Sequence, residues 1–571
     1  MKLDIREIPF SRRGSYFAIS YLTQTKSLWI RDVHGGDESP STLFELFIDG
    51  SSNIYEEEFL KKYEVIVNET KLVIKEKVSD NRLEIIYPTS EQLRIKNQGL
   101  KVTLKADKVR YDTLNQIEEK RFEYISYKKE TKYLLDFSTT AFTLEAPWYR
   151  VGNEFITIDL SDNQELLFTN YQVTPTEFIP FEMAFDRELE KVQSEFQNWR
   201  DGFGGYELYD KGFDLSTYII WSSIVREDGL LSGESIYMSK NWMQNIWSWD
   251  NCFNALGVSK VEPELAFNQF FIFVKHQHES GVYPDFINDK FRSYNCVKPP
   301  IHAWAYQLLM NESDYFKEVN RLKLIYKSIV KTTEFWLTSR VKEIGELPYY
   351  THGNDSGWDN ASIFHEGLPV IAPDLTAYLI QQLDLLSDWA ELLDLETESK
   401  KWKEIADSLT DKLIKELYDS NKKQFIAKSM MTGREIERYD SLILQLPIVI
   451  SYRLPKVIKE NLIENLMSRF ESEFGLTTES SKSLLYQVDG YWLGPIWAPE
   501  TYIFFDALHR AGEIDMSKRI AEKYCLLGET GGMAENYNPE TGSGNDDLSF
   551  TWTSSVFLKL REFVLKGRSH E

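Results

Sequence analysis

Apolar and polar residues alternate along much of the first third of the chain. The clearest runs are Leu100, Val102, Leu104 and Ala106, separated by lysine and threonine, and Ile156, Ile158 and Leu160. A period of two is typical of strands with one buried face. Turn-rich segments such as HGGDESPS and SDN separate the runs. The pattern predicts an N-terminal antiparallel β-sandwich over residues 1–180.

After Pro180 the apolar spacing changes to three and four residues. The first such stripe is Leu189, Val192, Phe196 and Trp199, and it ends at the glycines of DGFGG. This spacing predicts a connecting helix within residues 181–204. A second stripe follows Pro373 and Asp374 and consists of Leu379, Leu383, Leu386, Ala390 and Leu393. We therefore expect a helical domain over residues 205–571.

The long loops of this helical region share an unusual composition. They combine Trp, Tyr, Gly and Pro with carboxylates in NWMQNIWSWDNCF, GVYPDF, VKPPIHAW, HGNDSGWDN, GYWLGPIWAPE and GGMAENYNPETG. Long loops are usually either functional or disordered, and aromatic-rich segments are poor candidates for disorder. We interpret these loops as the walls of one site.

Composition and charge narrow the classes of partner. The chain has 571 residues, 42% of them hydrophobic, and a formal charge of -24, which disfavours nucleic acid and anionic membrane surfaces. No stretch approaches the roughly 20 apolar residues of a membrane helix, and the start MKLDIREIPFSRR lacks a secretion signal. Cytoplasmic residence is the expectation. Cys252, Cys296 and Cys525 fit neither a disulfide framework nor a paired zinc motif, so we expect buried, reduced thiols.

Two loops each present a carboxylate suited to acid–base chemistry. Asp359 follows Trp358 in SGWDN, where the indole favours a protonated acid, and Glu535 lies in a glycine-rich loop. Cleavage of a glycosidic bond commonly uses one protonated and one ionised carboxyl group. We interpret Asp359 and Glu535 as this pair, and Asp355 as a brace for its loop. Taken alone, Asp359 is better explained as the N-cap of a helix, a role that Asp often fills.

Flat indoles beside a carboxylate are suited to binding a sugar, which has an apolar face and a ring of hydroxyls. Trp247, Trp249 and Asp250 have this character, although two core tryptophans before a helix capped by Asp250 are an equal alternative. His302 is interpreted as a packed imidazole and Lys298 as a surface amine. The acids in SGNDDLSF lack the ligand spacing of a calcium loop, so neither a metal nor a cofactor is expected.

The motifs WSWDNCF, KPPIHAW, SGWDN, GYWLGPIW and MAENYNPETG, followed by FTWTSS, occur in the order found in glycoside hydrolase family 63. The chain resembles this family over roughly residues 205 to 565, and related patterns occur in trehalases and some glycogen-debranching enzymes. The resemblance implies an (α/α)6 barrel after the β-sandwich, with an inverting exo-glycosidase site at the barrel mouth. It assigns Asp359 as the general acid and Glu535 as the general base.

The same resemblance assigns the sugar-binding residues. Trp249 and Asp250 match positions that hold the terminal sugar, and Tyr491, Trp492 and Trp497 match an aromatic wall. Two residues depart from the family pattern: relatives often have Gln where this chain has Lys298, and Arg where it has Leu493. A lysine near the sugar would favour an acidic aglycone such as a glycerate, while loss of the arginine removes a hydrogen-bonding fork.

The sequence as a whole predicts an inverting, exo-acting α-glycosidase that releases a terminal neutral sugar, with α-glucose preferred, from a short oligosaccharide or glycoside. The candidate substrate-binding residues are Trp247, Trp249, Asp250, Lys298, Trp358, Tyr491, Trp492 and Trp497. The alternatives are an α-mannosidase or mannosylglycerate-type hydrolase, a trehalase-like or debranching enzyme, a polysaccharide lyase and a sugar-binding protein without turnover. A lyase would need a Tyr or His base and positive residues against a uronate, whereas these loops are acidic and aromatic.

Overall fold

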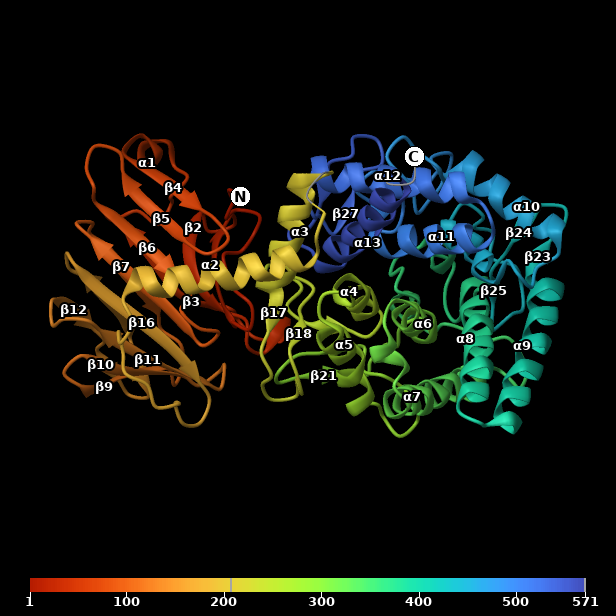
Figure 1. Ribbon diagram of the computed structural model, residues 1–571, viewed down its shortest axis with the longest axis horizontal. Coiled ribbons are helices and arrows are strands. Elements are labelled where there is room, and N and C mark those ends of the chain that lie inside the picture. Colours follow the sequence, from red (N-terminus) through yellow and green to blue (C-terminus); the bar gives the residue numbers. More distant parts are fainter. Residues whose placement is uncertain (206–207, 569–571) are drawn as a thin grey trace. The chain divides into compact units, whose positions relative to one another are not determined.

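The computed structural model describes residues 1–205 and 208–568 (Figure 1). Residues 206–207 and 569–571 of the predicted helical domain lie outside the described residues. The chain divides into two compact units that interleave along the sequence. The first comprises residues 1–204, 217–245 and 288–291, and the second comprises residues 205–216, 246–287 and 292–571. The parts expected from the sequence, 1–180, 181–204 and 205–571, are contiguous, whereas later segments of the chain return to the first of these two units.

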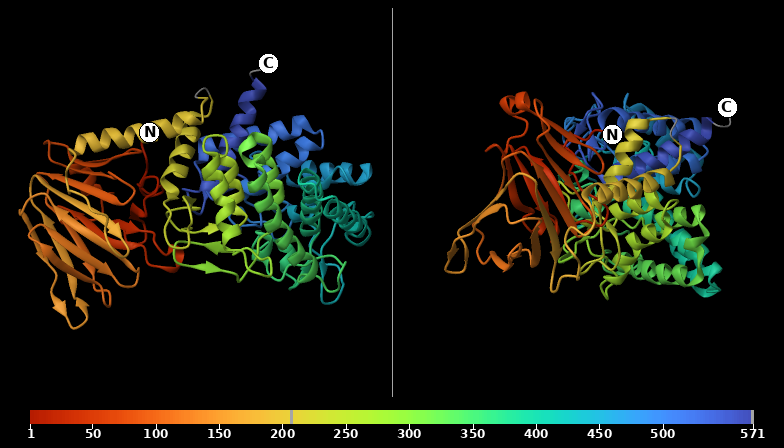
Figure 2. Two further views of the ribbon diagram at one scale, coloured as in Figure 1. Left: turned by 60° about the horizontal axis from the view of Figure 1, so that its bottom comes forward. Right: turned by 60° about the vertical axis from the view of Figure 1, so that its left-hand side comes forward.

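The first unit is built on two antiparallel sheets, coloured red to orange in Figure 2. One sheet has the order β1 (Phe17–Leu22), β2 (Ser27–Asp32), β3 (Thr42–Ile48), β8 (Val102–Asp107), β15 (Phe155–Leu160) and β12 (Phe142–Glu145). The other has the order β4 (Tyr63–Val67), β5 (Leu72–Glu76), β6 (Arg82–Ile86), β7 (Gln92–Gln98), β16 (Gln164–Tyr171), β11 (Thr131–Phe137), β10 (Arg121–Ser126) and β9 (Thr113–Glu118). The predicted antiparallel sandwich is confirmed.

The register of the strands explains the alternating pattern in the sequence. Leu104 of β8 lies opposite Leu46 of β3 on one side and Ile158 of β15 on the other, and all three are fully buried. Side chains two residues apart on a strand share a face, so this register collects one apolar face for the core. The stripe predicted after Pro180 forms α2 (Phe185–Gly202), and its apolar residues are buried.

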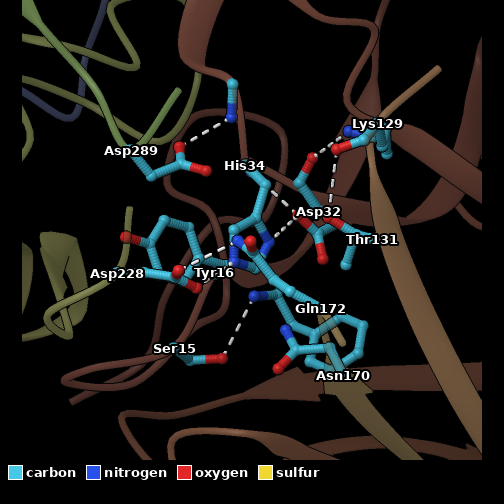
Figure 3. A network of polar contacts seen from close by, with 12 residues as sticks. Ser15, Tyr16, Asp32, His34, Lys129, Thr131, Asn170, Gln172, Asp228 and Asp289 are labelled. Carbon is cyan, nitrogen blue, oxygen red and sulfur yellow. Dashed lines mark hydrogen bonds and ion pairs between the residues drawn. The ribbon is translucent and has the colours of Figure 1, made fainter. Parts of the chain in front are cut away.

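A buried polar network joins the later segment 217–245 to the strands of the first unit (Figure 3). His34 pairs with Asp32 at 2.6 Å and with Asp228 at 3.2 Å, and its ring stacks on Tyr16 with centroids 3.6 Å apart. Burial lowers the pKa of His34, but the adjacent carboxylates, led by Asp32, raise it above its usual value. Removal of either partner would leave a buried charge without compensation, so the network helps to fix this segment in the first unit.

The second unit is an (α/α)6 barrel of alternating inner and outer helices, coloured green to blue in Figure 2. The inner elements α4 (Asp250–Val258), α6 (His302–Glu312), α8 (Pro373–Leu392), η5 (Leu442–Ile450), α11 (Ala498–Arg510) and α13 (Thr551–Arg568) contact one another in a closed ring. The other α-helices are α3 (Asp210–Ser223), which begins in this unit and ends in the first, α5 (Pro263–Lys275), α7 (Val319–Thr338), α9 (Glu396–Leu417), α10 (Lys456–Asn465) and α12 (Ile514–Gly531). The expected helical domain is confirmed.

Burial separates the two layers of the barrel. Every residue of α4 is buried, whereas α9 buries one stripe that includes Trp402, Leu409 and Leu413. Inner helices that alternate with outer ones all run in the same direction, so their N-terminal ends meet at one mouth of the barrel. The aromatic and acidic loops lead into the N-terminal ends of α4, α6, α8, α11 and α13. The connectivity therefore brings loops from across 300 residues of sequence to one place.

Candidate active site

The loop that carries Asp359 is built around a single 3₁₀ turn, η3 (Gly353–Ser356). Two glycines permit its close packing. A Cβ on Gly353 would lie 1.9 Å from the carbonyl oxygen of Asp359, and one on Gly357, whose φ is +76°, would lie 2.4 Å from the indole of Trp249. The half-buried Asp359 therefore reaches the site on a loop whose backbone permits no ordinary side chain at these two positions.

Asp355 braces this loop, as the sequence analysis expected. Its carboxylate accepts hydrogen bonds from the backbone amides of Val297, Thr351 and His352, and from Arg340 at 2.8 Å. Burial acts to raise the pKa of Asp355, but these donors, led by Arg340, hold it below its usual value. An ionised, fully bonded carboxylate cannot serve as a proton donor, so Asp359 is the acid of this loop that remains free for chemistry.

Glu535 lies immediately before β27 (Asn536–Tyr537), the central strand of a small sheet with β26 (Ile496–Trp497) and β28 (Gly544–Asn545). Its backbone amide donates to the carbonyl oxygen of Asp547 at 2.7 Å, and its side chain is 7% exposed. Tyr491 donates its hydroxyl to Oε1 of Glu535 at 3.1 Å. Burial, with smaller contributions from Asp546 and Asp547, raises the pKa of Glu535 to about 8.

Four of the predicted aromatic residues form a stacked wall beside this pair. The ring of Trp492 stacks on Trp497 at 4.1 Å and on Trp358 at 4.9 Å, and Tyr491 meets Trp497 edge to face at 4.8 Å. Tyr491 has a φ of +63°, which is strained for a residue with a side chain. The indole N–H of Trp497 donates to the Tyr491 carbonyl oxygen at 2.9 Å and fixes this strained backbone.

The structure places the two predicted tryptophans before α4 differently. Trp249 is 2% exposed and contacts the ring of Trp492 at 6.5 Å, whereas Trp247 lies in β19 (Ile246–Trp247) and contacts Phe286 at 6.0 Å. Within residues 1–205 and 208–568, no ring contact joins Trp247 to the stacked wall. Trp249 therefore belongs to the candidate site, and Trp247 lies at its edge.

Asp250 is the first residue of α4 and does not cap it. The N-cap position is Trp249, and no side chain makes a capping hydrogen bond. Asp250 is 5% exposed, and among the described residues its Oδ1 has no hydrogen-bond partner. Burial raises the pKa of Asp250 to about 7. A buried acceptor without a partner is costly, and a sugar hydroxyl would supply the missing donor.

Lys298 is not the surface amine that its residue type alone favours. Its side chain is 7% exposed, and its ammonium lies 3.2 Å from Oδ1 of Asp285 and donates to the carbonyl oxygen of Asn354 at 2.9 Å. The sequence analysis did not select Asp285, although it lies in the GVYPDF loop, whose aromatic and Pro-rich setting resembles that of Asp359. His302 is a packed imidazole as expected, with its Nε2 3.0 Å from the carbonyl oxygen of Ser248. Burial lowers its pKa to about 4.

The candidate carboxyl groups all affect the pKa of one side chain, the hydroxyl of Tyr491. Burial first, and then the charges of Glu535, Asp359 and Asp250, raise the pKa of Tyr491 well above its usual value. These three carboxyl groups therefore act electrostatically on the same side chain. Among the residues that the structure describes, no group of three or more His, Cys, Asp or Glu side chains is arranged to hold a metal ion. The candidate site contains the carboxyl groups of Asp359, Glu535 and Asp250, the ammonium of Lys298 and the aromatic rings of the wall.

Comparison with known proteins identifies the family. Residues 243–553 match the model of the mannosylglycerate hydrolase MGH1-like glycoside hydrolase domain. The chain belongs to this family. It is accordingly a glycoside hydrolase, an enzyme class that hydrolyses O-glycosyl bonds, and the resemblance to glycoside hydrolase family 63, whose enzymes invert, is confirmed. One relative, the mannosylglycerate hydrolase of Rubrobacter radiotolerans, is 20% identical over 410 residues, which cover 56% of this chain and 91% of the relative.

Solved structures show the same fold. The family 63 mannosylglycerate hydrolase of Thermus thermophilus in complex with glucose has a TM-score of 0.54 and 17% identity, covering 60% of this chain and 98% of its own. The same enzyme has also been solved in complex with Tris and D-glycerate. A bacterial glucoamylase complexed with acarbose has a TM-score of 0.63 and 11% identity, covering 99% of this chain and 94% of its own. At these identities the likeness shows the fold alone.

No helix within residues 1–205 and 208–568 has the length and apolar character needed to cross a bilayer.

Proposed function

We propose that the chain is an exo-acting hydrolase of a small α-glycoside, of the mannosylglycerate type, that uses Asp359 as general acid and Glu535 as general base. The observation that carries the proposal is the hydrogen bond from Tyr491, a member of the aromatic wall, to Oε1 of Glu535 at 3.1 Å. A half-buried and a buried carboxyl group beside an aromatic wall supply both parts that glycoside hydrolysis requires, proton transfer and a sugar platform.

In this mechanism Asp359 protonates the oxygen of the leaving group, while Glu535 removes a proton from a water that attacks the anomeric carbon from the opposite face. Burial raises the pKa of Asp359, which suits an acid that must hold its proton near neutral pH. Glu535 must be ionised to act as a base. Since its pKa is raised to about 8, we expect activity to increase as the pH rises toward 8.

The terminal sugar would lie against Tyr491, the partly exposed ring in front of the buried tryptophans of the wall, with Asp250 accepting a hydrogen bond from one of the sugar's hydroxyls. The family model and the named relatives favour a mannosylglycerate-type substrate over the α-glucoside preferred from the sequence motifs. The choice between mannose and glucose depends on hydroxyl orientation, which a site built to hydrogen-bond a hydroxyl discriminates strongly.

A substrate panel tests the proposal. The full chain is incubated with α-mannosylglycerate, α-glucosylglycerate, trehalose and maltose, and released monosaccharide is measured by chromatography, with Asp359→Asn as the control for contaminating activity. We expect the fastest release from α-mannosylglycerate. Proton NMR of early product should show β-mannose first. Release of monosaccharide from none of the four would refute the substrate class, and initial α-anomer would refute inversion.

A further inference from the structure

Lys298 is the cation at the centre of the candidate site. An ammonium has three donors, and two of its neighbours are fixed: Oδ1 of Asp285 at 3.2 Å and the carbonyl oxygen of Asn354 at 2.9 Å. Asn354 lies in η3, five residues before the candidate acid Asp359. A hydrogen bond to a charged donor is stronger than one between neutral groups. Lys298 therefore attaches the Asp359 loop to the segment that enters α6.

Three carboxyl groups interact electrostatically with the ammonium of Lys298. The groups that act on Lys298 are Asp285, before β20 (Phe286–Ile287), Asp359, after η3, and Asp250, in the first turn of α4. Burial lowers the pKa of Lys298, but these carboxylates, led by Asp285, raise it above its usual value. In turn, the charge of Lys298 is the largest effect that lowers the pKa of each of the three acids, against the rise that burial causes.

We propose that Lys298 is a positioning residue, which holds the loop of the general acid through Asn354 and balances the charges of Asp285, Asp359 and Asp250. The proposal rests on the proposed function. It assigns Lys298 to holding the loop of the acid, whereas a lysine near the sugar was expected to bind an acidic aglycone. A free lysine would attract the carboxylate of a glycerate aglycone, whereas this ammonium is already paired. With three acids around one cation, a further carboxylate beside Lys298 would add repulsion.

The proposal has a consequence for the pH dependence of turnover. A neighbouring cation favours the ionised form of a carboxyl group, so Lys298 limits how far burial raises the pKa of Asp359. Loss of the cation would let the acid hold its proton to higher pH, and the alkaline limb of the rate profile would move upward. Loss of the tether at Asn354 would also misplace the acid, and small displacements cost up to about 100-fold in rate.

The test compares Lys298→Met with the wild-type chain on two substrates, α-mannosylglycerate and α-mannosylglycerol, in which the carboxylate of the first is replaced by an uncharged hydroxymethyl group in the second. A positioning role predicts that kcat falls about 10- to 100-fold on both substrates by the same factor, with the alkaline limb at higher pH. An anchoring role predicts instead that KM rises on α-mannosylglycerate alone while kcat and the limb stay unchanged. That second outcome would overturn the proposal.

Two further variants separate positioning from a general loss of stability. Lys298→Met combined with Asp285→Asn removes both charges, and we expect it to recover thermal stability without recovering the wild-type pH profile. Lys559→Met is the matched control, because Lys559 is a largely buried lysine that pairs with Glu312 elsewhere in the barrel. It should lower the melting temperature without moving the alkaline limb.

Hydrogen exchange provides a readout that does not require turnover. Lys298→Met should increase amide exchange in residues 351–360, since the tether to Asn354 is lost, whereas Lys559→Met should not. Unchanged exchange in this segment would overturn the positioning role. If the wild-type chain hydrolyses neither substrate, the proposed function fails, while the exchange result still decides the role of Lys298.

Discussion

The hydrogen bond from Tyr491 to Glu535 offers a direct test of the base assignment. Tyr491→Phe removes only the hydroxyl that donates to Oε1 of Glu535 at 3.1 Å. The ring, with its edge-to-face contact to Trp497 at 4.8 Å, is kept. The substitution therefore changes the electrostatics of the base while the aromatic wall stays in place.

The expected magnitude follows from the loss of one hydrogen bond to a charged acceptor. Such a bond contributes about 1.5–3 kcal/mol, and about 1.36 kcal/mol corresponds to one pKa unit. The bond stabilises the ionised form of Glu535, so its loss raises further a pKa that is already about 8. Because the base must be ionised, the acidic limb of kcat/KM should move to higher pH. The value at pH 7 should fall about 10- to 100-fold.

The assay is a pH profile of kcat/KM on the best substrate for the wild-type chain and Tyr491→Phe. Tyr306→Phe is the matched control, because the hydroxyl of Tyr306 donates to the backbone carbonyl oxygen of Phe316 at 3.0 Å and not to a carboxylate. It should lower stability without moving either limb. An acidic limb that stays in place in Tyr491→Phe, or moves to lower pH, would refute the assignment of Glu535 as the base.

Three other predictions concern the acids. Asp359→Asn and Glu535→Gln should each lower kcat by roughly 100-fold or more, while Asp355→Asn should mainly lower the melting temperature; near-normal kcat in either of the first two removes its catalytic assignment. Asp250→Ala should lower kcat/KM far more than thermal stability, and strong unfolding without a kinetic defect would return it to a structural role. Burial raises the pKa of Asp374 from 3.8 to about 7, so the folded state binds this proton more tightly than the unfolded state. The contribution of Asp374 to stability is then fully present below pH 3.8 and is lost as the pH rises through about 7. In Asp374→Asn, the free energy of unfolding by urea should therefore differ less between about pH 5 and about pH 8 than it does in the wild-type chain. An equal difference in both would contradict the buried-acid interpretation.

The sequence by itself determined the classes of structure and selected the candidate acids. The alternation at Leu104 and Ile158 predicts strands because side chains two residues apart share a face, and no distant contact is needed to read it. The helical stripe of α2 is local in the same way. Asp359 and Glu535 could be selected as candidates because each stands in a loop whose glycines and aromatic residues are adjacent in sequence.

Only the tertiary structure decided how these local pieces act on one another. The bond between Tyr491 and Glu535 joins residues 44 positions apart, and the pairing of Lys298 with Asp285 depends on two loops that meet at the barrel mouth. Burial is a property of the packed fold, and it changed Lys298 from an expected surface amine into the central cation of the site. The same burial raises the pKa of Glu535, because removing a carboxylate from water disfavours its charge, and no run of residues in the sequence carries that information.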